Sequence, residues 1–293
     1  MELYKSGKYI ICQPLGGIND MLCQIGHCIE YAEKFNRTLI IDAITSDLND
    51  HFSNYFQLAN PTEFIHIRLE DAQVHVIQND PTFNIDIALR YEASDLKTHP
   101  LDMYVDSVDK FVLHRAYGGG LQSLYALKYF TLLPHIADKI KNTKNSLGEY
   151  HAVLIRNTDY QTDYQQALTD IRSLGINNPL YLFTDDYTVQ NYAKTLGFSK
   201  LIVNENLYKS DDTYLPIMHV CRVSPKVPAI EINVQVLSDL FLSALADHIY
   251  PTYIVGYLGD RRFANGSMQS GFIRLSIALN QDKVLLNSIL SIT

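Results

Sequence analysis

The sequence predicts an α/β protein built from two doubly wound domains, and two observations support that prediction. Near the N-terminus, a strand, a glycine turn, a helix and a second strand are expected in turn within residues 8–42. In the second half, short apolar runs alternate with helical patterns of about ten residues or more. Strands joined by helices of this length pair in parallel, because the helix carries the chain back to the end of the sheet where the previous strand began.

The N-terminal unit begins with the apolar run Lys8–Gln13, which is expected to be a strand, and the turn Pro14–Gly17 follows it. Asn19 is expected to cap the next helix, because its short side chain can accept from a free backbone N–H. Apolar residues then recur at the helical period as far as Phe35, and Thr38–Asp42 is expected to form the second strand.

The region from 43 to 115 is expected to contain short strands, such as Phe64–Ile67 and Val74–Ile77, separated by long loops. Gly118–Gly120 forms a turn before an expected helix at Leu121–Phe130.

A further helix is expected at Pro134–Lys141. The polar run Asn142–Gly148 after it predicts the domain boundary, which gives an N-terminal domain of residues 1–145 and a C-terminal domain of residues 146–293.

The C-terminal domain shows the clearest alternation of strands and helices. Strands are expected at Ala152–Arg156, Leu180–Thr184, Leu201–Val203 and Tyr253–Val255, and helices at Asp163–Leu174, Thr188–Leu196, Val234–Asp247 and Ser270–Leu279.

Composition narrows the classes of protein that fit. The net charge of −8 argues against a nucleic-acid binder, which usually carries a basic face, although a local basic pocket for an anion remains compatible. Three of the four cysteines, Cys12, Cys23 and Cys28, lie in apolar periodic segments and are expected in the core, and Cys221 completes no metal-binding spacing. The start of the chain is too polar for a signal peptide, and no apolar run reaches the roughly 18 residues of a membrane span. A cytoplasmic protein is therefore expected, and any contact with the inner membrane would be peripheral.

Arg156 follows the most apolar strand of the C-terminal half, in the run HAVLIRNTDY. Ligands of open α/β sheets bind beyond the carboxyl ends of the strands, where an arginine can hold a phosphate with two parallel hydrogen bonds. The alternative is an ion pair with a nearby carboxylate such as Asp159.

Asp185 and Asp186 follow the strand Leu180–Thr184. Their carboxylates can accept from a ribose or from the amino edge of a base. The alternative is that they cap the following helix. No metal is expected, because no further acidic residue lies at a D-x-D spacing nearby.

Two glycine-containing stretches can approach a ligand. Gly16, Gly17, Asn19 and Asp20 lie where a helix begins, and a helix N-terminus favours negative charge, although an ordinary tight turn fits equally well. Asn265–Phe272, after Arg261 and Arg262, is rich in small hydroxylated residues before a helix. It can form a phosphate cradle, or simply a flexible loop with a serine cap. His27 lies in the first helix, facing either the core or a binding site.

Taken in order, these stretches resemble the superfamily of α1,2-, α1,6- and protein O-fucosyltransferases. GGINDMLCQIGHCIEYAEKFNRTLIID resembles its GGxxNQ-type opening, LIRNTDY its HxRRxDY or HxRxTD motif, and Thr184–Asp186 its TDD or SDD strand end. KYFTLLPHIADKIK resembles the segment before the central motif, and Asn265–Leu279 takes the place of its Ser-Ser-Phe motif. Leu154 stands where the superfamily usually has His, and Gly271 where it has a second Ser.

The resemblance implies a GT-B fold, in which two Rossmann-like domains face each other across a cleft, with the donor GDP-fucose on the C-terminal domain and the acceptor on the N-terminal one. It places Arg156 on the β-phosphate and Asp185 or Asp186 on the nucleoside. The other residues it implies for the donor site are Asp159, Ser267, Ser270, Gly271 and Phe272, and those for the acceptor side are Gly16, Gly17, Asn19 and His27.

The implied reaction is metal-independent, inverting transfer of fucose to a hydroxyl of a glycan or lipid-linked oligosaccharide in bacterial surface polysaccharide synthesis. Arg156 and helix-end N–H groups would stabilise the leaving diphosphate. Asp20 is a candidate general base, or else only a complement to the helix dipole. The departures at Leu154 and Gly271 leave two alternatives: another nucleotide sugar, or a non-catalytic nucleotide- or glycan-binding protein on the same fold.

Overall fold

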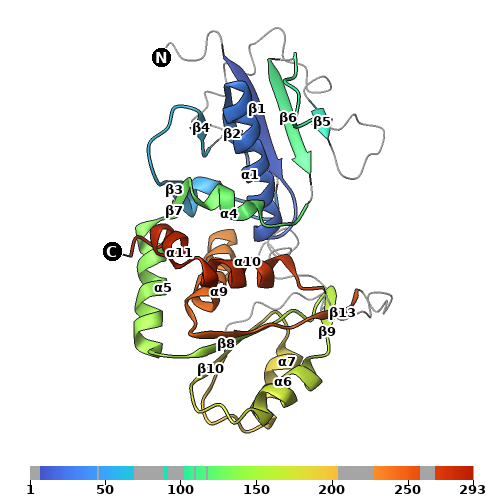
Figure 1. Ribbon diagram of the computed structural model, residues 1–293, viewed down its shortest axis with the longest axis vertical. Helices are drawn as coiled ribbons and strands as arrows, with labels where there is room; N and C mark the ends of the chain where they lie inside the picture. The colour runs from blue at the N-terminus through green and yellow to red at the C-terminus, as the bar shows by residue number, and fades with distance from the viewer. Residues whose placement is uncertain are drawn as a thin grey trace. The chain divides into compact units, whose positions relative to one another are not determined.

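The structure is a computed structural model of the 293-residue chain. It describes residues 7–44, 46–68, 89–91, 102–108, 110–116, 118–203, 228–257 and 268–292. The chain divides into two compact units, Met1–Leu133 with Ser291–Thr293, and Pro134–Leu290 (Figure 1). The expected strand Val74–Ile77 and the residues Cys221, Arg261, Arg262 and Ser267 lie outside the described residues.

The first unit contains a five-stranded sheet in the order β4-β2-β1-β6-β5, in which every pairing is parallel. The strands are β1 (Lys8–Pro14), β2 (Arg37–Ile41), β4 (Ile65–His66), β5 (Leu89–Tyr91) and β6 (Phe111–Ala116). Four successive residues of β1 are buried, as expected for a central strand covered on both faces. The chain moves from β1 to β2 on one side and returns to β6 on the other, so β1 and β6 flank the point where the strand order reverses.

Helix α1 (Ile18–Phe35) connects β1 to β2 and packs on the short helix α4 (Gln122–Leu127). Gly26 makes this contact possible, since a Cβ there would lie 2.5 Å from the backbone oxygen of Gln122. The 3-10 turn η1 (Phe52–Asn54) precedes a small antiparallel sheet of β3 (Phe56–Leu58) and β7 (Phe130–Leu132).

Three sequence expectations in this unit need correction. Helix α1 begins at Ile18 with Gly17 as its N-cap, so Asn19 is not the cap. The expected helix Leu121–Phe130 stops at Leu127, because Phe130 pairs within the sheet of β3 and β7. Strand β6 was not expected, because His114 and Arg115 interrupt its apolar run.

The second unit contains a parallel sheet in the order β11-β10-β8-β12. Its strands are β8 (His151–Ile155), β10 (Leu180–Thr184), β11 (Leu201–Val203) and β12 (His248–Tyr250). After β8 the chain moves through β10 to β11 and then returns to β12 on the other side of β8. The reversal of strand order therefore falls between β8 and β12.

Helices cover both faces of this sheet (Figure 1). Helices α6 (Tyr164–Ser173) and α7 (Tyr187–Thr195) close one face, where Val153, Ile155, Leu180 and Leu182 meet Leu168, Ile171, Val189 and Ala193 in a buried core. On the other face lies α9 (Ala229–Leu245), which packs against α5 (Pro134–Leu147) and α10 (Gly271–Gln281). Helix α11 (Lys283–Ile289) follows α10.

A two-stranded antiparallel ribbon extends the second unit beyond the main sheet. Strand β9 (Tyr160–Thr162) follows β8 after a four-residue link, and β13 (Ile254–Tyr257) follows β12. Because the two strands that flank the reversal point each lead into one arm of the ribbon, the ribbon lies next to that point.

The expected boundary at Asn142–Gly148 falls inside α5, and the two compact units divide instead between Leu133 and Pro134. The polar run forms the exposed end of an amphipathic helix that stops at Leu147, and Gly148 follows it at φ +67. In the sheet, the strand after α9 is β12 and not the expected Tyr253–Val255, whose residues largely form the ribbon. Helix α11 was not expected. The prediction of buried cysteines is confirmed at Cys12, Cys23 and Cys28.

Candidate functional site

The carboxyl ends of β8 and β10 bring together four residues that the sequence assigned to a donor site. Arg156 follows β8 directly, with Asp159 three residues later, while Asp185 and Asp186 follow β10. Since β8 also borders the reversal point with β12, these side chains lie where open α/β sheets bind their ligands. The sequence assigned these four residues together, and the tertiary structure brings them together.

Arg156 forms a two-point ion pair with Asp159. Its Nε donates to Oδ1 at 2.9 Å and its Nη2 donates to Oδ2 at 2.8 Å. The ring of Tyr160 covers the guanidinium, with Cζ 4.7 Å from the ring centroid. The side chains of Arg156 and Asp159 keep 26% and 17% of their exposure, so the pair lies at the surface and solvent can reach it.

Asp185 and Asp186 attach the loop after β8 to the end of β10. Asp185 accepts from the backbone N–H of Asn157 and from the Thr158 hydroxyl, both at 2.8 Å. Burial raises the pKa of Asp185, while the hydrogen bond from Asn157 and the charge of Arg156 oppose that rise. Asp186 accepts from the Asn157 side chain at 2.7 Å and also caps α7 through the N–H of Thr188.

The capping role proposed as an alternative for this pair is therefore confirmed for Asp186. Within the described residues, each of the four carboxylate oxygens of Asp185 and Asp186 accepts one hydrogen bond. A carboxylate oxygen can accept a second one.

The ribbon connects this loop to the start of α10. The N–H of Ile254 in β13 donates to the carbonyl of Met268 at 2.8 Å, two residues before Ser270. Ser270 caps α10 by accepting from the N–H of Ile273, and Gly271 and Phe272 are half-buried in its first turn. The serine cap was one of the two expectations for this stretch, and it is confirmed.

In the first unit, the turn after β1 holds Gly16 at φ +90, a conformation that favours glycine. Asp20, in the first turn of α1, lies directly against this glycine, because a Cβ on Gly16 would be 3.0 Å from Asp20 Oδ2. A Cβ on Gly17 would meet nothing within 4 Å, so the backbone of Gly17 borders open space. His27 is half-buried further along the same helix.

Asn19 is buried and acts as a link between helices. Its side chain donates to the carbonyl of Gly120 at 3.3 Å and accepts from the Ser123 hydroxyl at 2.8 Å. Gln24, one turn further along, donates to the carbonyl of Gly118. Both side chains therefore hydrogen-bond to the turn that follows β6. They hold the backbone next to the point where the strand order reverses, between β1 and β6.

His114 in β6 completes this buried polar network. Its Nε2 lies 2.7 Å from Gln24 Oε1. Burial and, to a smaller extent, the nearby His27 lower the pKa of His114 to about 4. The ring is therefore neutral at physiological pH.

Among the described residues, no three His, Cys, Asp or Glu side chains come close enough to hold a metal ion together. The described helices include none with the length and apolar character needed to cross a bilayer.

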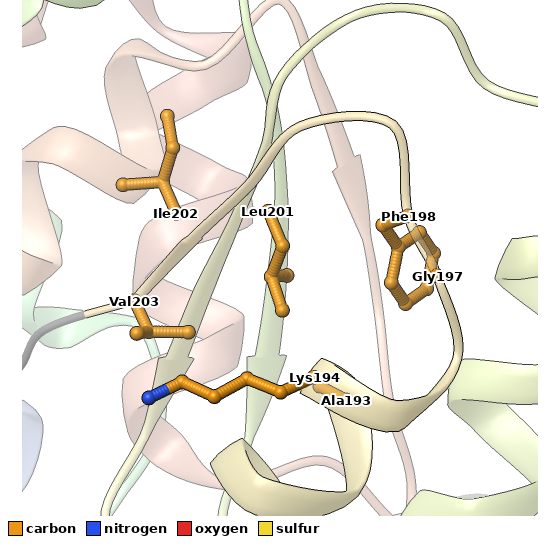
Figure 2. A pocket seen from close by; sticks show the side chains of 7 residues that line it. All are labelled: Ala193, Lys194, Gly197, Phe198, Leu201, Ile202 and Val203. Atoms are coloured by element: carbon orange, nitrogen blue, oxygen red, sulfur yellow. The ribbon is translucent and has the colours of Figure 1, made fainter.

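A pocket of about 490 Å³ lies between the end of α7 and the edge strand β11 (Figure 2). Lys194, Phe198 and Val203 are among the side chains that line it. None of the residues that the sequence assigned to the donor or acceptor site lines this pocket.

The two units, each with a parallel doubly wound sheet, form a GT-B-type α/β fold, and this agrees with the two Rossmann-like domains predicted from the sequence. Neither the protein-family models nor the curated proteins include a match to this chain. Several solved structures, by contrast, are similar to this chain. The fucosyltransferase NodZ from Bradyrhizobium is 16% identical, with a TM-score of 0.58, and the alignment covers 94% of this chain and 93% of NodZ.

A structure of NodZ α-1,6-fucosyltransferase co-crystallised with GDP is 15% identical, with the same coverage of both chains and a TM-score of 0.57. FUT1 of Arabidopsis thaliana, in complex with GDP, is 9% identical with a TM-score of 0.49, covering 94% of this chain and 69% of FUT1. At these identities the NodZ likeness establishes the fold.

Sequence reasoning missed the residues that connect the donor-site side chains. Asn157 and Thr158 hold Asp185, and Thr162 donates from its hydroxyl to the carbonyl of Arg156 at 2.7 Å. The only signal was that all three lie within the RNTDYQT run. Gln24 and Ser123 were missed because their partners are about one hundred residues away in the sequence.

Proposed function

We propose that this protein is an inverting glycosyltransferase that transfers fucose from GDP-fucose to a hydroxyl group of a glycan. The observation that carries the proposal is the position of Arg156, a partly exposed guanidinium directly beyond β8 at the reversal point of a Rossmann-like sheet. The fold of NodZ, whose structures include one with GDP and one soaked with GDP-fucose, supports the same assignment.

The chemistry follows from where negative charge develops. When the sugar departs, the diphosphate oxygens gain charge, and preorganised donors that meet them lower the barrier. In the proposed site Arg156 is one such donor. The start of α10, at Ser270 and Gly271, is a second, because the first N–H groups of this 11-residue helix have no partner within the helix and point away from that end.

The acceptor hydroxyl would attack the sugar from the face opposite the diphosphate, which inverts the anomeric centre. Asp20 is the proposed base. Its place against Gly16 and beside the open backbone of Gly17 supports an acceptor-side role. Asn19, by contrast, is proposed to support this turn through Gly120 and Ser123, because its side chain is already used for that purpose.

Asp185 and Asp186 keep the proposed nucleoside contact in addition to their role in holding the loop. Gly271 and Phe272 are proposed to line the diphosphate pocket, and His27 the acceptor side. The acceptor class we propose is a glycan or lipid-linked oligosaccharide of a bacterial surface polysaccharide, and the reaction is proposed to need no metal.

A second candidate is the same chemistry with another nucleotide sugar. Leu154 replaces the usual histidine of the resembling superfamily and is only 2% exposed within β8, so it brings no polar group to the donor. Gly271 stands where the resembling superfamily has a second serine, so it provides no hydroxyl at the start of α10.

A thermal-shift comparison of GDP, UDP, CMP and dTDP distinguishes these candidates. A nucleotide present at 100 times its Kd stabilises its protein by about 2.7 kcal/mol. We expect GDP to raise the melting temperature most, and GDP-fucose to release GDP when a suitable glycan is added. Stabilisation by UDP alone would favour the second candidate, and no stabilisation by any nucleotide would overturn the transferase assignment. Stabilisation by GDP without sugar transfer to any glycan tested would favour a binding protein.

A further inference from the structure

We propose that Asp159 is a positioning residue: it holds the guanidinium of Arg156 so that the opposite edge is presented to the diphosphate, and it does not contact the donor itself. This inference rests on the proposed function of the site. It replaces the direct donor contact that the sequence implied for Asp159.

Asp159 contacts only one edge of the Arg156 guanidinium. It accepts from Nε and from one N–H of Nη2, which is the side of the planar group nearest the chain. A guanidinium carries five N–H donors, so three remain, one on Nη2 and two on Nη1. Among the described residues, Nη1 has no hydrogen-bond partner. These remaining donors form an end-on fork that fits two oxygens of a phosphate.

Asp159 is itself held in place by its own loop. Its Oδ1 accepts from the N–H of Tyr160 at 2.9 Å and lies 3.3 Å from the Thr158 hydroxyl. The single Thr158 proton goes to Asp185, at the shorter distance of 2.8 Å, so besides Arg156 the firm donor to Asp159 is the backbone N–H of Tyr160. A carboxylate held by the backbone of its own loop is a poor candidate for displacement by a ligand.

An aromatic ring also holds the guanidinium. Tyr160 covers one face of Arg156 and also starts β9, which pairs with β13. Asp159 fixes the guanidinium within its plane and Tyr160 fixes it perpendicular to that plane. Together they remove most of the rotamer freedom that a long arginine would otherwise lose on binding.

Charge also argues against direct contact with the donor. A carboxylate placed against a diphosphate repels it, whereas the same carboxylate behind an arginine leaves the arginine charged and oriented. The competing interpretation is that Asp159 occupies the fork as an internal substitute for the phosphate and is displaced on binding. The two interpretations predict opposite effects of removing the carboxylate.

Calorimetric titration of GDP and of guanosine into wild type, Asp159→Ala and Asp159→Asn tests the proposal. We expect Asp159→Ala to weaken GDP binding by about 2- to 10-fold, which is the cost of ordering one long side chain. The affinity for guanosine should not change. Asp159→Asn keeps one acceptor for Nε and should lie between wild type and Asp159→Ala. In turnover, kcat should fall along with the rise in KM for the donor, because the fork acts on a charge that grows in the transition state.

Asp282→Ala is the matched control. Asp282 caps α11 by accepting from the N–H of Leu285, so its loss removes a helix cap without touching the loop of Arg156. GDP affinity should stay at the wild-type value in this variant.

Tighter GDP binding by Asp159→Ala would overturn the proposal and establish Asp159 as a competitor. Unchanged GDP binding, or equal losses for GDP and guanosine, would also overturn it, because neither is specific to the phosphate fork. Failure of wild type to bind GDP would instead count against the proposed function, which separates the two.

Discussion

Replacing Arg156 with alanine is the most direct test of the proposed donor site. The substitution removes two charge-assisted hydrogen bonds to Asp159 and the stacking of the guanidinium on Tyr160. It leaves the rest of the loop in place, because Asn157 and Thr158 still attach it to Asp185.

The expected loss of stability is small and can be worked out from these contacts. An ion pair that solvent can reach contributes roughly 0.2–1 kcal/mol, and an exposed cation–π contact about 0.5–1 kcal/mol. The sum is about 1–2 kcal/mol. In proteins of 150–250 residues, each kcal/mol lowers the melting temperature by roughly 2–4 °C.

The expected loss of activity is much larger. Removing one preorganised donor to a developing negative charge typically lowers kcat by about 10²–10³. Turnover should fall more than GDP affinity, because the contact strengthens as the leaving group gains charge. Arg156→Lys should recover only part of the activity, since a single ammonium cannot make the two-point contact.

GDP release from GDP-fucose, measured per folded molecule alongside the melting temperature, provides the test. If Arg156 serves only the ion pair with Asp159, the alanine variant melts a few degrees lower and its folded fraction turns over normally. A folded Arg156→Ala protein with near wild-type turnover would refute the donor-site assignment and most of the case for a transferase.

The remaining predictions concern the first unit and the metal. Asp20→Asn should lower kcat while GDP affinity stays within about twofold in a titration; equal losses of both would make Asp20 a structural residue. Turnover should persist in EDTA, and a complete loss that Mg²⁺ or Mn²⁺ restores would contradict metal independence. Gly26→Ala should lower the free energy of unfolding in urea by about 1–3 kcal/mol, because its Cβ would lie 2.5 Å from the Gln122 carbonyl; Gly17→Ala, whose Cβ meets nothing, is the control. The pKa of His114 is about 4 in the fold, below its ordinary value of 6.5, so below pH 6.5 the unfolded chain binds a proton that the native ring refuses. Stability should therefore fall by roughly 3 kcal/mol between pH 6.5 and 4. His114→Gln should flatten that part of a denaturation series, and an unchanged slope would refute the assignment.

Much of the fold could be predicted where a strand is continuously apolar. The runs that became β1, β2, β8 and β10 are buried on both faces, so hydropathy alone marks them. Prediction failed at β6 and β12, whose runs include His114, Arg115 and His248. The buried ring of His114 is accommodated because Gln24 hydrogen-bonds it across ninety residues of sequence, a contact that no local pattern reveals.

The candidate site shows the same division. The sequence singled out Arg156, Asp185 and Ser270 because each follows a strand or begins a helix. It left open whether each side chain binds a ligand or serves the fold. In the structure each of these side chains makes hydrogen bonds within the protein. Arg156 bonds to Asp159, Asp185 to Asn157 and Thr158, and Ser270 to Ile273.

The sequence by itself determined the α/β class, the main strands and the residues at their carboxyl ends, because hydrophobic period and turn chemistry are local properties of the chain. Only the tertiary structure decided which strand ends are neighbours. The order β11-β10-β8-β12 puts Arg156 beside Asp185, and the β9–β13 ribbon links both to the start of α10. Strand order and hydrogen-bond direction depend on contacts between segments far apart in the sequence. The Arg156–Asp159 pair itself is local, three residues apart, and within the described part of the chain it leaves the other edge of the guanidinium without a hydrogen-bond partner.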